Sequence, residues 1–413
     1  MLKVITSLWK NEKINNVIIF APKTVLSVWE KEIKDSVLVP IKFTDDLLNP
    51  QSDSGCLTIC LKNYEALRSF KKSKRFKSYD LAICDESHRI KNRNSISAKV
   101  TYKLTRESKY RFCLSGTPMG NEEIDFYSQY RFLDENIFGK RYKDFDQTFF
   151  KPTGYMGYKR KFKSEARKKA FYALVNQHSY RITKQECLEL PDITETIIPI
   201  DIKCRKAYDK LKKDLMVEFE NKYGDRLTIE APKAIVLVTK LQQLCCGFIY
   251  DENHTVIPQG DDSKLVALKE LIEDHNGEKI VIFCKYSWEI DNINEELSKH
   301  HRVLVYDGRT RNKEVWNKLS TDYDIMIAQI KSGGTGLNLQ CASTVVFYSL
   351  PYSYIDVSQA KDRVYRNGQN HKVSIYYLIG KNTIEENIYH IVNQKLSGAV
   401  AILDDFRKTT SSL

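Results

Sequence analysis

The sequence has no run of the roughly 18 apolar residues that a membrane-spanning helix needs. Its start, from Met1 to Lys10, also lacks the apolar core and the small-residue cleavage site of a secretory signal peptide. These two absences exclude a helical membrane protein and argue against a secreted one. They predict a soluble, cytoplasmic protein without a membrane partner.

The ten cysteines lack the spacing of a metal site. The close pairs are Cys56 with Cys60 and Cys245 with Cys246, and neither has the second half that a zinc site needs. The other cysteines are scattered, several of them inside apolar segments, which does not match the disulfide framework of a small secreted protein. The cysteines therefore indicate reduced thiols in an intracellular compartment.

Chain length and charge further narrow the classes of protein to which this sequence can belong. The 413 residues exceed what one core organises, because single cores stop growing near roughly 250 to 300 residues. Hydrophobic residues make up 42% of the chain and charged residues 29%, which excludes a disordered or fibrous protein. The 65 Lys and Arg residues outnumber the 53 Asp and Glu residues, and the net charge of +12 favours a polyanionic partner, nucleic acid before an anionic membrane.

Two series of short apolar segments alternate with longer amphipathic ones, the pattern of parallel strands connected by helices. The first series predicts strands at residues 17–21, 57–61, 79–84 and 111–114. The second predicts strands at residues 279–284, 303–306, 324–329, 344–348 and 373–378. Each series is typical of a doubly wound α/β sheet, so we predict two α/β lobes.

The boundaries of the lobes follow from changes in composition. Residues 132–250 lose the alternation and carry Lys, Glu, Phe and Tyr at helical spacing, which predicts a mostly helical insert. The first lobe then covers residues 1–131 and the second covers residues 263–413. The polar run 251–262 is predicted to be a hinge, with Ser263 capping the helix that follows.

Two lysine-dense segments, residues 71–77 and 159–169, interleave Phe and Tyr with positive charge. Such a segment can contact a phosphate backbone. The alternative is a solvated helix face or loop, and for either segment taken alone this alternative is slightly favoured.

An acidic pair, Asp85 and Glu86, directly follows the apolar segment 79–84. Ligands of open parallel sheets bind beyond the carboxyl ends of the strands, where this pair stands. Asp85 can hold a Mg²⁺ ion that bridges nucleotide phosphates, and Glu86 can orient or deprotonate an attacking water. The alternative is a negatively charged helix start near the positive end of the helix dipole.

The next predicted strand is followed by Ser115, Gly116, Thr117 and Pro118. Two hydroxyl groups in a tight turn at the same sheet edge can sense the carboxylates and relay their state to a bound polymer. Without that context, the four residues are only a favourable turn sequence.

Gln359, Arg363 and Arg366 are spaced by four and three residues, which predicts one face of a helix that Gly368 ends. Arginine stays charged and binds phosphate with two nitrogens, and a well-placed arginine raises phosphoryl-transfer rates by roughly 10³ to 10⁵. The alternative is a surface stripe that pairs with Asp362 or its neighbours.

A glycine-rich segment, SGGTG at residues 332–336, follows the predicted strand 324–329. Gly334 and Gly336 have no side chains, so their backbone amides can approach phosphate or ribose closely. Carboxylates in one lobe and arginines in the other then describe an ATP site between the lobes.

Five segments resemble, in this order, the superfamily-two helicase-like ATPases of the Swi/Snf-related group: VIIFAPKTVLSVW at 17–29, DESH at 85–88, SGTP at 115–118, KSGGTGLNL at 331–339 and QAKDRVYRNGQ at 359–369. The pattern QAxDRxxRxGQ is highly specific, and the resemblance spans nearly the whole chain. It implies two RecA-like lobes with helical protrusions, ATP hydrolysis between them with Mg²⁺, and translocation along double-stranded DNA, usually without strand separation.

The resemblance also implies residue roles. The implied catalytic residues are Asp85, which holds Mg²⁺, Glu86, Arg363 and Arg366. Nucleotide binding is implied for Gln359, Gly334 and Gly336, and coupling for His88, Ser115 and Thr117. Contact with nucleic acid is implied for Lys23, Lys331 and Thr335.

The sequence departs from the family pattern at the phosphate-cradling loop, GxGKT or GxGKS, expected about one helix before residues 17–21. Neither GKT nor GKS occurs, since Gly139 and Lys140 precede Arg141, and Gly380 and Lys381 precede Asn382. We interpret this as a shortened reading frame, a mis-assigned start or a loop donated by another polypeptide. The alternative function is a catalytically degenerate nucleic-acid-binding protein, and RNA remodelling fits the charge equally well.

A second departure lies at residues 346–358, where many nuclear remodellers carry an Asp and a Trp-Asn-Pro sequence. This chain has Ser349, Pro351 and Tyr352 there. The variant is closer to compact bacterial and phage members, which disfavours a role specific to nucleosomes.

Overall fold

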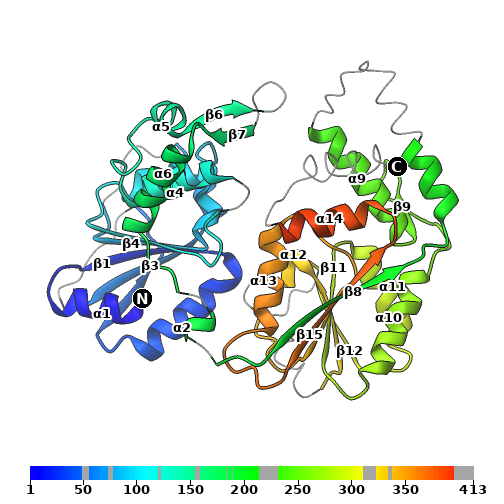
Figure 1. Cartoon of the computed structure of the whole chain (residues 1–413). Coiled ribbons are helices and arrows are strands. Elements are labelled where there is room, and N and C mark those ends of the chain that lie inside the picture. Colours follow the sequence, from blue (N-terminus) through cyan, green and yellow to red (C-terminus); the bar gives the residue numbers. More distant parts are fainter. Residues whose placement is uncertain are drawn as a thin grey trace. The chain divides into compact units, whose positions relative to one another are not determined.

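The computed structural model describes residues 1–48, 55–72, 78–119, 122–153, 159–182, 184–187, 189–213, 231–309, 322–333 and 337–394. The chain divides into two compact units, Met1–Arg181 (unit 1) and Ile182–Leu413 (unit 2) (Figure 1). The division falls inside the predicted insert 132–250, so that segment is shared between the units. The predicted hinge stays a prediction, and its residues include β10 (Val256–Pro258), which pairs antiparallel with β9 (Phe248–Tyr250).

Unit 1 is built on a five-stranded sheet in the order β2-β3-β1-β4-β5, and all its strand pairs are parallel (Figure 1). The strands are β1 (Asn16–Ala21), β2 (Ile41–Thr44), β3 (Leu57–Asn63), β4 (Leu81–Asp85) and β5 (Tyr110–Leu114). The helices are α1 (Leu2–Lys10), α2 (Leu26–Ser36), α3 (Ile96–Thr105) and α4 (Phe126–Leu133), with short 3₁₀ turns η1 (Lys23–Val25), η2 (Ala66–Phe70), η3 (Ser87–Ile90) and η4 (Glu123–Asp125).

The central strand β1 shows why this segment forms a strand covered on both sides. Val17 and Ile19 join a core that includes Ile5 of α1 and Ile33 of α2. The alternate residues, Ile18 among them, join a second core with residues of α3 and α4. A continuous apolar run is what a parallel strand needs when helices cover both faces.

An aromatic protrusion completes unit 1. It contains α5 (Tyr142–Phe149), the antiparallel strands β6 (Phe150–Thr153) and β7 (Lys159–Phe162), and α6 (Glu165–Gln177). Its core consists mainly of Phe and Tyr side chains, with the Phe138 and Phe171 rings stacked at 5.2 Å between centroids.

Unit 2 is built on a six-stranded sheet in the order β12-β13-β11-β14-β15-β8, also parallel throughout. The strands are β8 (Ile193–Ile200), β11 (Ile280–Cys284), β12 (Val303–Tyr306), β13 (Ile325–Gln329), β14 (Thr344–Phe347) and β15 (Val373–Gly380). The helices are α7 (Lys184–Cys187), α9 (Ala231–Cys245), α10 (Ser263–Asp274), α11 (Ser287–Leu297), α12 (Ile330–Gly333), α13 (Tyr354–Val364) and α14 (Ile384–Asn393).

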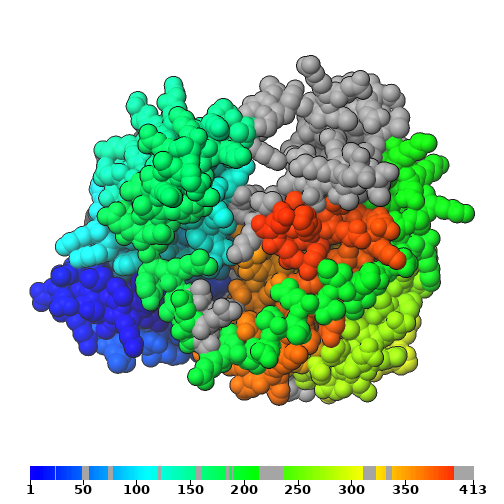
Figure 2. Space-filling model, in the orientation of Figure 1, coloured from blue at the N-terminus to red at the C-terminus, as the bar shows by residue number. Residues whose placement is uncertain are grey.

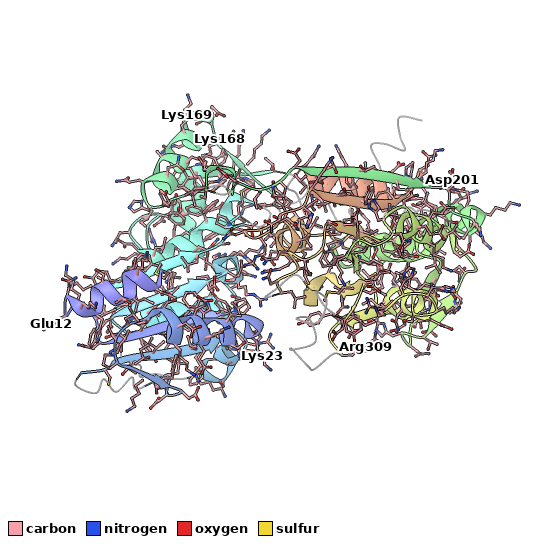
Figure 3. All side chains as sticks on the ribbon, turned by 90° about the horizontal axis from the view of Figure 1, so that it is seen from below. Glu12, Lys23, Lys168, Lys169, Asp201 and Arg309 are labelled. Atoms are coloured by element: carbon pink, nitrogen blue, oxygen red, sulfur yellow. The ribbon has the colours of Figure 1, made fainter. Side chains whose placement is uncertain are left out.

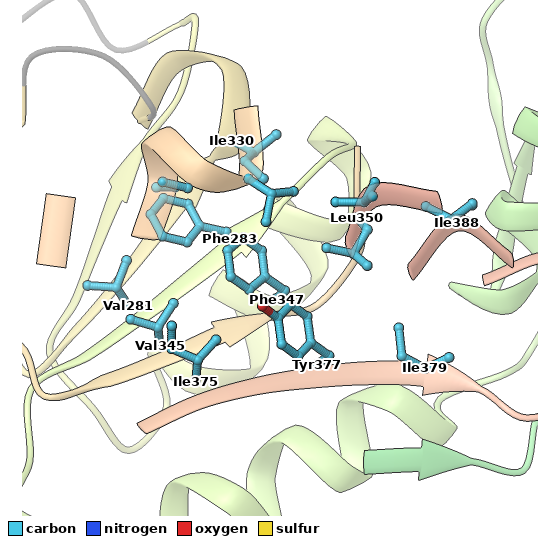
Figure 4. Close-up of a cluster of buried hydrophobic side chains, with 14 of the residues drawn as sticks. Val281, Phe283, Ile330, Val345, Phe347, Leu350, Ile375, Tyr377, Ile379 and Ile388 are labelled. Carbon is cyan, nitrogen blue, oxygen red and sulfur yellow. The ribbon is translucent and has the colours of Figure 1, made fainter. Parts of the chain in front are cut away.

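Aromatic rings hold the middle of the unit 2 sheet together. Phe283 and Phe347 stack at 5.5 Å, and Phe347 and Tyr377 stack at 5.2 Å, so the rings continue across β11, β14 and β15 (Figure 4). These side chains pack with residues of α9, α13 and α14, while α10 and α11 pack with the core that contains Ile282. The predicted fold class, two doubly wound parallel α/β units, is confirmed.

Strand β8 lies inside the segment that we predicted to be mostly helical, and that prediction is wrong for these residues. The strand pairs with β15 from Ile193 opposite Val373 to Ile200 opposite Gly380. It is the edge strand and most of its side chains are exposed, so it needs no continuous apolar run (Figure 2). An exposed edge strand therefore lacks the signal by which the central strands were predicted.

A second expectation fails at the start of α10. Ser263 is the first helical residue, and the N-cap position belongs to Asp262. The Asp261 carboxylate instead accepts hydrogen bonds from the Ser263 amide at 3.0 Å and from its hydroxyl at 2.6 Å. The serine therefore receives support from an acidic side chain before the helix rather than capping the helix itself.

A buried ion pair connects α10 with α14. Lys264 Nζ donates to Glu385 Oε1 at 2.6 Å, and the two side chains are only 2% and 3% exposed. Burial alone would lower the pKa of Lys264, but the neighbouring Cys246 and Glu385 raise it overall. The Glu385 carboxylate also accepts the Gly380 amide at 2.8 Å, so both charges are held by several polar groups.

Candidate nucleotide site

The acidic pair stands at the carboxyl edge of the unit 1 sheet. Asp85 is the last residue of β4 and lies in register with Leu114 of β5, so Ser115 follows at the same edge. Glu86 adopts a left-handed backbone conformation with φ of 50°, which is strained for a residue with a side chain and is often found at functional sites. The chain therefore turns sharply at the position predicted for the attacking water's base.

Three hydrogen bonds orient Asp85. Its Oδ2 accepts the indole N–H of Trp29 at 2.8 Å, and its Oδ1 accepts the amide of Glu86 at 3.0 Å. The Tyr64 hydroxyl donates to the Asp85 backbone carbonyl at 2.6 Å. Trp29 and Tyr64 were not predicted as site residues, although Trp29 ends the first of the five resembling segments.

His88 lies close to the second carboxylate. Its Nδ1 is 3.3 Å from Glu86 Oε2, and the side chains are 14% and 23% exposed. The contact is a charge interaction only when the imidazole is protonated. The predicted coupling residue is thus next to the predicted catalytic one.

Gln129 of α4 connects the acidic segment with the Ser115–Pro118 turn. The Ser87 hydroxyl donates to Gln129 Oε1 at 2.7 Å, and Gln129 Nε2 donates to the Pro118 carbonyl at 2.6 Å. Gln129 is 2% exposed, which makes both bonds costly to lose. The amino-acid sequence gives no sign of this role, because a single glutamine inside a helix carries no motif.

The turn itself has the expected hydroxyl arrangement. The Thr117 amide donates to Ser115 Oγ at 3.1 Å. Among the described residues, the buried hydroxyl oxygen of Thr117 finds no hydrogen-bond partner. A buried hydroxyl without a partner is uncommon in folded proteins, and it marks the turn as a position that is not optimised for stability alone.

In unit 2, Gln359 and Arg363 lie on α13, but Arg366 does not. The helix ends at Val364, earlier than the predicted end at Gly368, so the three side chains do not share one helical face. Gly368 has φ of +91°, and an added Cβ atom would come within 2.9 Å of the Gln340 side chain. This glycine therefore serves a tight turn after the helix.

Further hydrogen bonds join the arginine segment to the end of the glycine-rich one. The Leu339 amide donates to the Arg363 carbonyl at 3.0 Å. Gln369 Nε2 donates to the Ala342 carbonyl at 2.8 Å. A backbone hydrogen bond thus joins the two resembling segments of unit 2, and the Gln369 side chain adds a bond to the loop after residue 339.

The predicted nucleic-acid contacts are only partly covered by the described residues. Lys23 in η1 is exposed, and Figure 3 labels it on unit 1. Lys331 in α12 is exposed as well. Gly334, Thr335 and Gly336 lie outside the described residues.

One lysine that was not predicted stands at the carboxyl end of the central strand β11. Lys285 Nζ donates to Gln242 Oε1 at 2.7 Å and lies 3.3 Å from the centre of the Tyr352 ring. Burial lowers the pKa of this amine to about 7, although Glu289 opposes the effect. Tyr352 belongs to segment 346–358, where the sequence departs from the family pattern. Lys285 is therefore a residue that this variant segment contacts.

No helix in the described part of the chain combines the length and apolar character that crossing a membrane requires. In the same residues, no group of three or more His, Cys, Asp or Glu side chains is placed to hold a metal ion. Mg²⁺ in phosphate sites does not need such a cage, because one or two carboxylates, water and the phosphates usually hold it.

Comparison with known proteins decides the family. Residues 1–248 match the SNF2-related domain, and residues 263–368 match the helicase conserved C-terminal domain. The chain belongs to the SNF2-related family. The resemblance to the Swi/Snf-related group of superfamily-two ATPases is thereby confirmed, whereas the roles of individual residues stay predictions.

The SNF2-related chain is similar to larger proteins. A Mycoplasma genitalium protein named an uncharacterized ATP-dependent helicase is 30% identical over 354 residues, which cover 82% of this chain and 32% of that protein. A Schizosaccharomyces pombe chromatin structure-remodeling complex subunit is 26% identical over 434 residues, with 96% and 36% covered. The chain thus spans about a third of the length of these relatives.

A solved structure, the Sulfolobus solfataricus SWI2/SNF2 ATPase core in complex with dsDNA, is also similar. It shares 23% identity and a TM-score of 0.40, with 95% of this chain and 83% of that chain covered.

Proposed function

We propose that this SNF2-related chain works as an ATP-dependent motor on duplex DNA. Asp85 and Glu86 of unit 1, with Arg363 and Arg366 of unit 2, would act on the same ATP molecule. The observation that carries the proposal is the sharp left-handed turn at Glu86, directly after an Asp85 carboxylate that two N–H groups orient at the carboxyl edge of a parallel sheet.

The donor set fits Mg²⁺. Each carboxylate oxygen of Asp85 accepts one N–H group, and a carboxylate oxygen can accept more than one interaction. When bound, Mg²⁺ would neutralise charge on the phosphates. Because the Trp29 and Glu86 N–H groups orient Asp85, the carboxylate would meet the ion without first reorganising.

The other steps of ATP hydrolysis would be carried out by side chains of this protein. Glu86 would position the attacking water and accept its proton. The guanidinium groups of Arg363 and Arg366 would stabilise the negative charge that develops on the transferred phosphoryl group. The bonds from Ser87 through Gln129 to Pro118 would transmit the state of the acidic segment to the Ser115–Pro118 turn.

Duplex DNA is the nucleic acid along which we propose that the motor moves. The net charge of +12 supports a polyanionic partner, and Lys23, Lys331 and Thr335 would contact phosphates rather than bases. Recognition of the backbone gives little sequence preference, as a translocating motor requires. Competition between duplex DNA and duplex RNA for the chain decides between the two nucleic acids.

The experiment compares ATP hydrolysis with and without duplex DNA in wild type, Glu86→Gln and Glu12→Gln. Glu12 is the matched control because it also has a left-handed backbone, φ of 56°, but lies before β1, at the opposite end of the strands (Figure 3). We expect Glu86→Gln to reduce turnover by roughly 10² to 10⁴ through loss of the base, with DNA binding retained. Equal activity of Glu86→Gln and wild type would contradict the proposal.

A second candidate function is nucleic-acid binding without hydrolysis, and the net charge of +12 supports it without any need for ATP. Titration calorimetry with ATP separates the two functions. Mg²⁺-dependent ATP binding that Asp85→Asn weakens supports the motor. Duplex binding without any measurable ATP affinity or turnover supports the second function.

A further inference from the structure

The hairpin of β6 and β7 places two lysines directly opposite each other. In its register, Lys151 faces Lys161 and Phe150 faces Phe162. Directly opposite residues project from the same face of a two-stranded sheet, where like charges repel and destabilise the pairing. Both lysines are exposed, and the described residues offer neither of them an ion pair. The pairing therefore works against the stability of the hairpin.

The other face of the hairpin is anchored in the protrusion. Phe150 and Phe162 stack at 4.8 Å, and both rings contact Phe171 of α6. Arg160, two residues from Phe162, donates from Nε to Asp146 Oδ1 at 2.7 Å, and this bond raises the pKa of the arginine. Because this face is fixed by aromatic packing and an ion pair, the hairpin holds its two lysines outward.

The start of α6 adds further exposed positive charge to the protrusion. Ser164 caps the helix by accepting the Arg167 amide at 3.2 Å. Arg167, Lys168 and Lys169 follow and are exposed, and Figure 3 shows Lys168 and Lys169 extending outward. Glu165, the first residue of α6, is acidic, and its carboxylate is 3.9 Å from Lys168 Nζ.

We propose that this surface, here called the hairpin patch, binds the phosphate backbone of duplex DNA. The patch is the opposed pair Lys151 and Lys161, and the exposed Lys163, Arg167, Lys168 and Lys169 of the protrusion add positive charge around it. It adds a contact area in the protrusion of unit 1 to the contacts predicted for Lys23, Lys331 and Thr335. The choice of DNA as ligand rests on the proposed function, whereas the contact itself requires no ATP hydrolysis.

The aromatic residues of the segment favour a duplex over a single strand. Proteins that bind single strands offer exposed aromatic rings on which unpaired bases stack. Here the rings of Phe150, Phe162 and Phe171 pack against one another in the core of the protrusion. As far as the structure describes residues 150–171, the protrusion therefore offers charge without an exposed stacking surface beside the patch, which suits a backbone whose bases are already stacked.

The first test neutralises the opposed pair in the full chain. Lys151→Gln with Lys161→Gln is compared with Lys3→Gln with Lys10→Gln, two exposed lysines of α1 in the same unit, so both variants lose the same charge. Fluorescence anisotropy measures affinity for a labelled duplex over a salt series. A plot of log affinity against log salt has a negative slope. We expect this slope to become shallower by about 1.8 in the hairpin variant, since each lost phosphate contact removes about 0.9. An unchanged slope, or an equal change in the α1 control, would overturn the proposal.

The second test separates binding from folding. Lys161→Glu places an acid directly opposite Lys151, which should favour the hairpin pairing while weakening DNA binding. We expect an unchanged or higher thermal midpoint together with a lower affinity for the duplex. A fall in both quantities would show that the lysines serve the fold and would overturn the proposal.

Two outcomes distinguish this proposal from the proposed function. If the wild-type chain binds no duplex, both fail. If it binds duplex but the hairpin variants bind equally well, only the hairpin patch fails. Binding to vesicles of phosphatidylserine and phosphatidylcholine that the hairpin variant loses, with duplex binding unchanged, would assign the patch to a membrane surface and overturn it as well.

Discussion

The two units share a doubly wound parallel sheet but hold their polar groups differently. In unit 1, Asp85 and Glu86 are half-buried at the sheet edge, and the Asp85 carboxylate accepts N–H groups from Trp29 and Glu86. In unit 2, Lys264 and Glu385 form an ion pair inside the protein. Unit 1 thus keeps this acidic pair partly open to solvent at the sheet edge, whereas unit 2 uses a buried charge pair to join two helices.

The largest effect is expected from removing one buried charge of unit 2. Lys264→Met should lower the free energy of unfolding by about 3 to 5 kcal/mol, because it leaves the Glu385 carboxylate buried without its partner. Denaturant unfolding of the full chain measures the loss.

The double variant Lys264→Met with Glu385→Gln is the control for this prediction. The glutamine oxygen can still accept the Gly380 amide, and neither charge of the Lys264–Glu385 pair remains. We expect the double variant to be more stable than Lys264→Met alone. If it is equally unstable, lost packing rather than an unpaired charge is responsible.

In unit 1, Gln129 tests whether the hydrogen-bonded network does more than support the fold. Gln129→Leu removes the bonds to Ser87 and Pro118 and should cost about 1 to 3 kcal/mol of stability. Gln129→Glu keeps an acceptor for Ser87 but removes the donor to Pro118. We expect both variants to hydrolyse ATP without DNA as wild type does, and to lose stimulation by DNA.

The ratio of ATP turnover with DNA to turnover without DNA is the measurement for these variants. A merely structural role for Gln129 predicts that both rates fall together with stability. In that case the proposed transmission from the acidic segment to the Ser115–Pro118 turn is wrong.

The last prediction concerns Lys285, an amine at the carboxyl edge of the unit 2 sheet, as the acidic pair is in unit 1. Its pKa is about 7 in the folded chain and 10.5 in the reference state, so between these pH values the unfolded chain binds a proton that the folded chain does not. The free energy of unfolding therefore gains up to about 1.4 kcal/mol per pH unit as the pH rises through this window.

Lys285→Met lacks this contribution. Wild-type stability relative to the variant should thus increase from pH 7 to pH 10, as followed by denaturant unfolding at several pH values. Lys372→Met, at an exposed lysine of the same unit, is the control. A constant difference between wild type and Lys285→Met would show that the amine titrates normally.

The central strands and the family could be predicted from the amino-acid sequence. Strands such as β1 and β11 are covered by helices on both faces, so they require uninterrupted apolar residues that stand out in a linear sequence. The motif segments are equally local, which is why their order was enough to indicate the family. The edge strand β8 escaped because its exposed side chains impose no such pattern.

Only the tertiary structure could decide where α13 ends and which side chains support the site. The helical spacing continues through Arg366, but the helix ends at Val364, where the backbone of Tyr365 leaves the helical conformation with ψ of 82°. Trp29 and Gln129 reach their partners from elements far along the chain, and Lys285 reaches Gln242 in the same way. Local residue patterns determine which segments become strands and motifs, whereas contacts between distant segments exist only after the chain has packed.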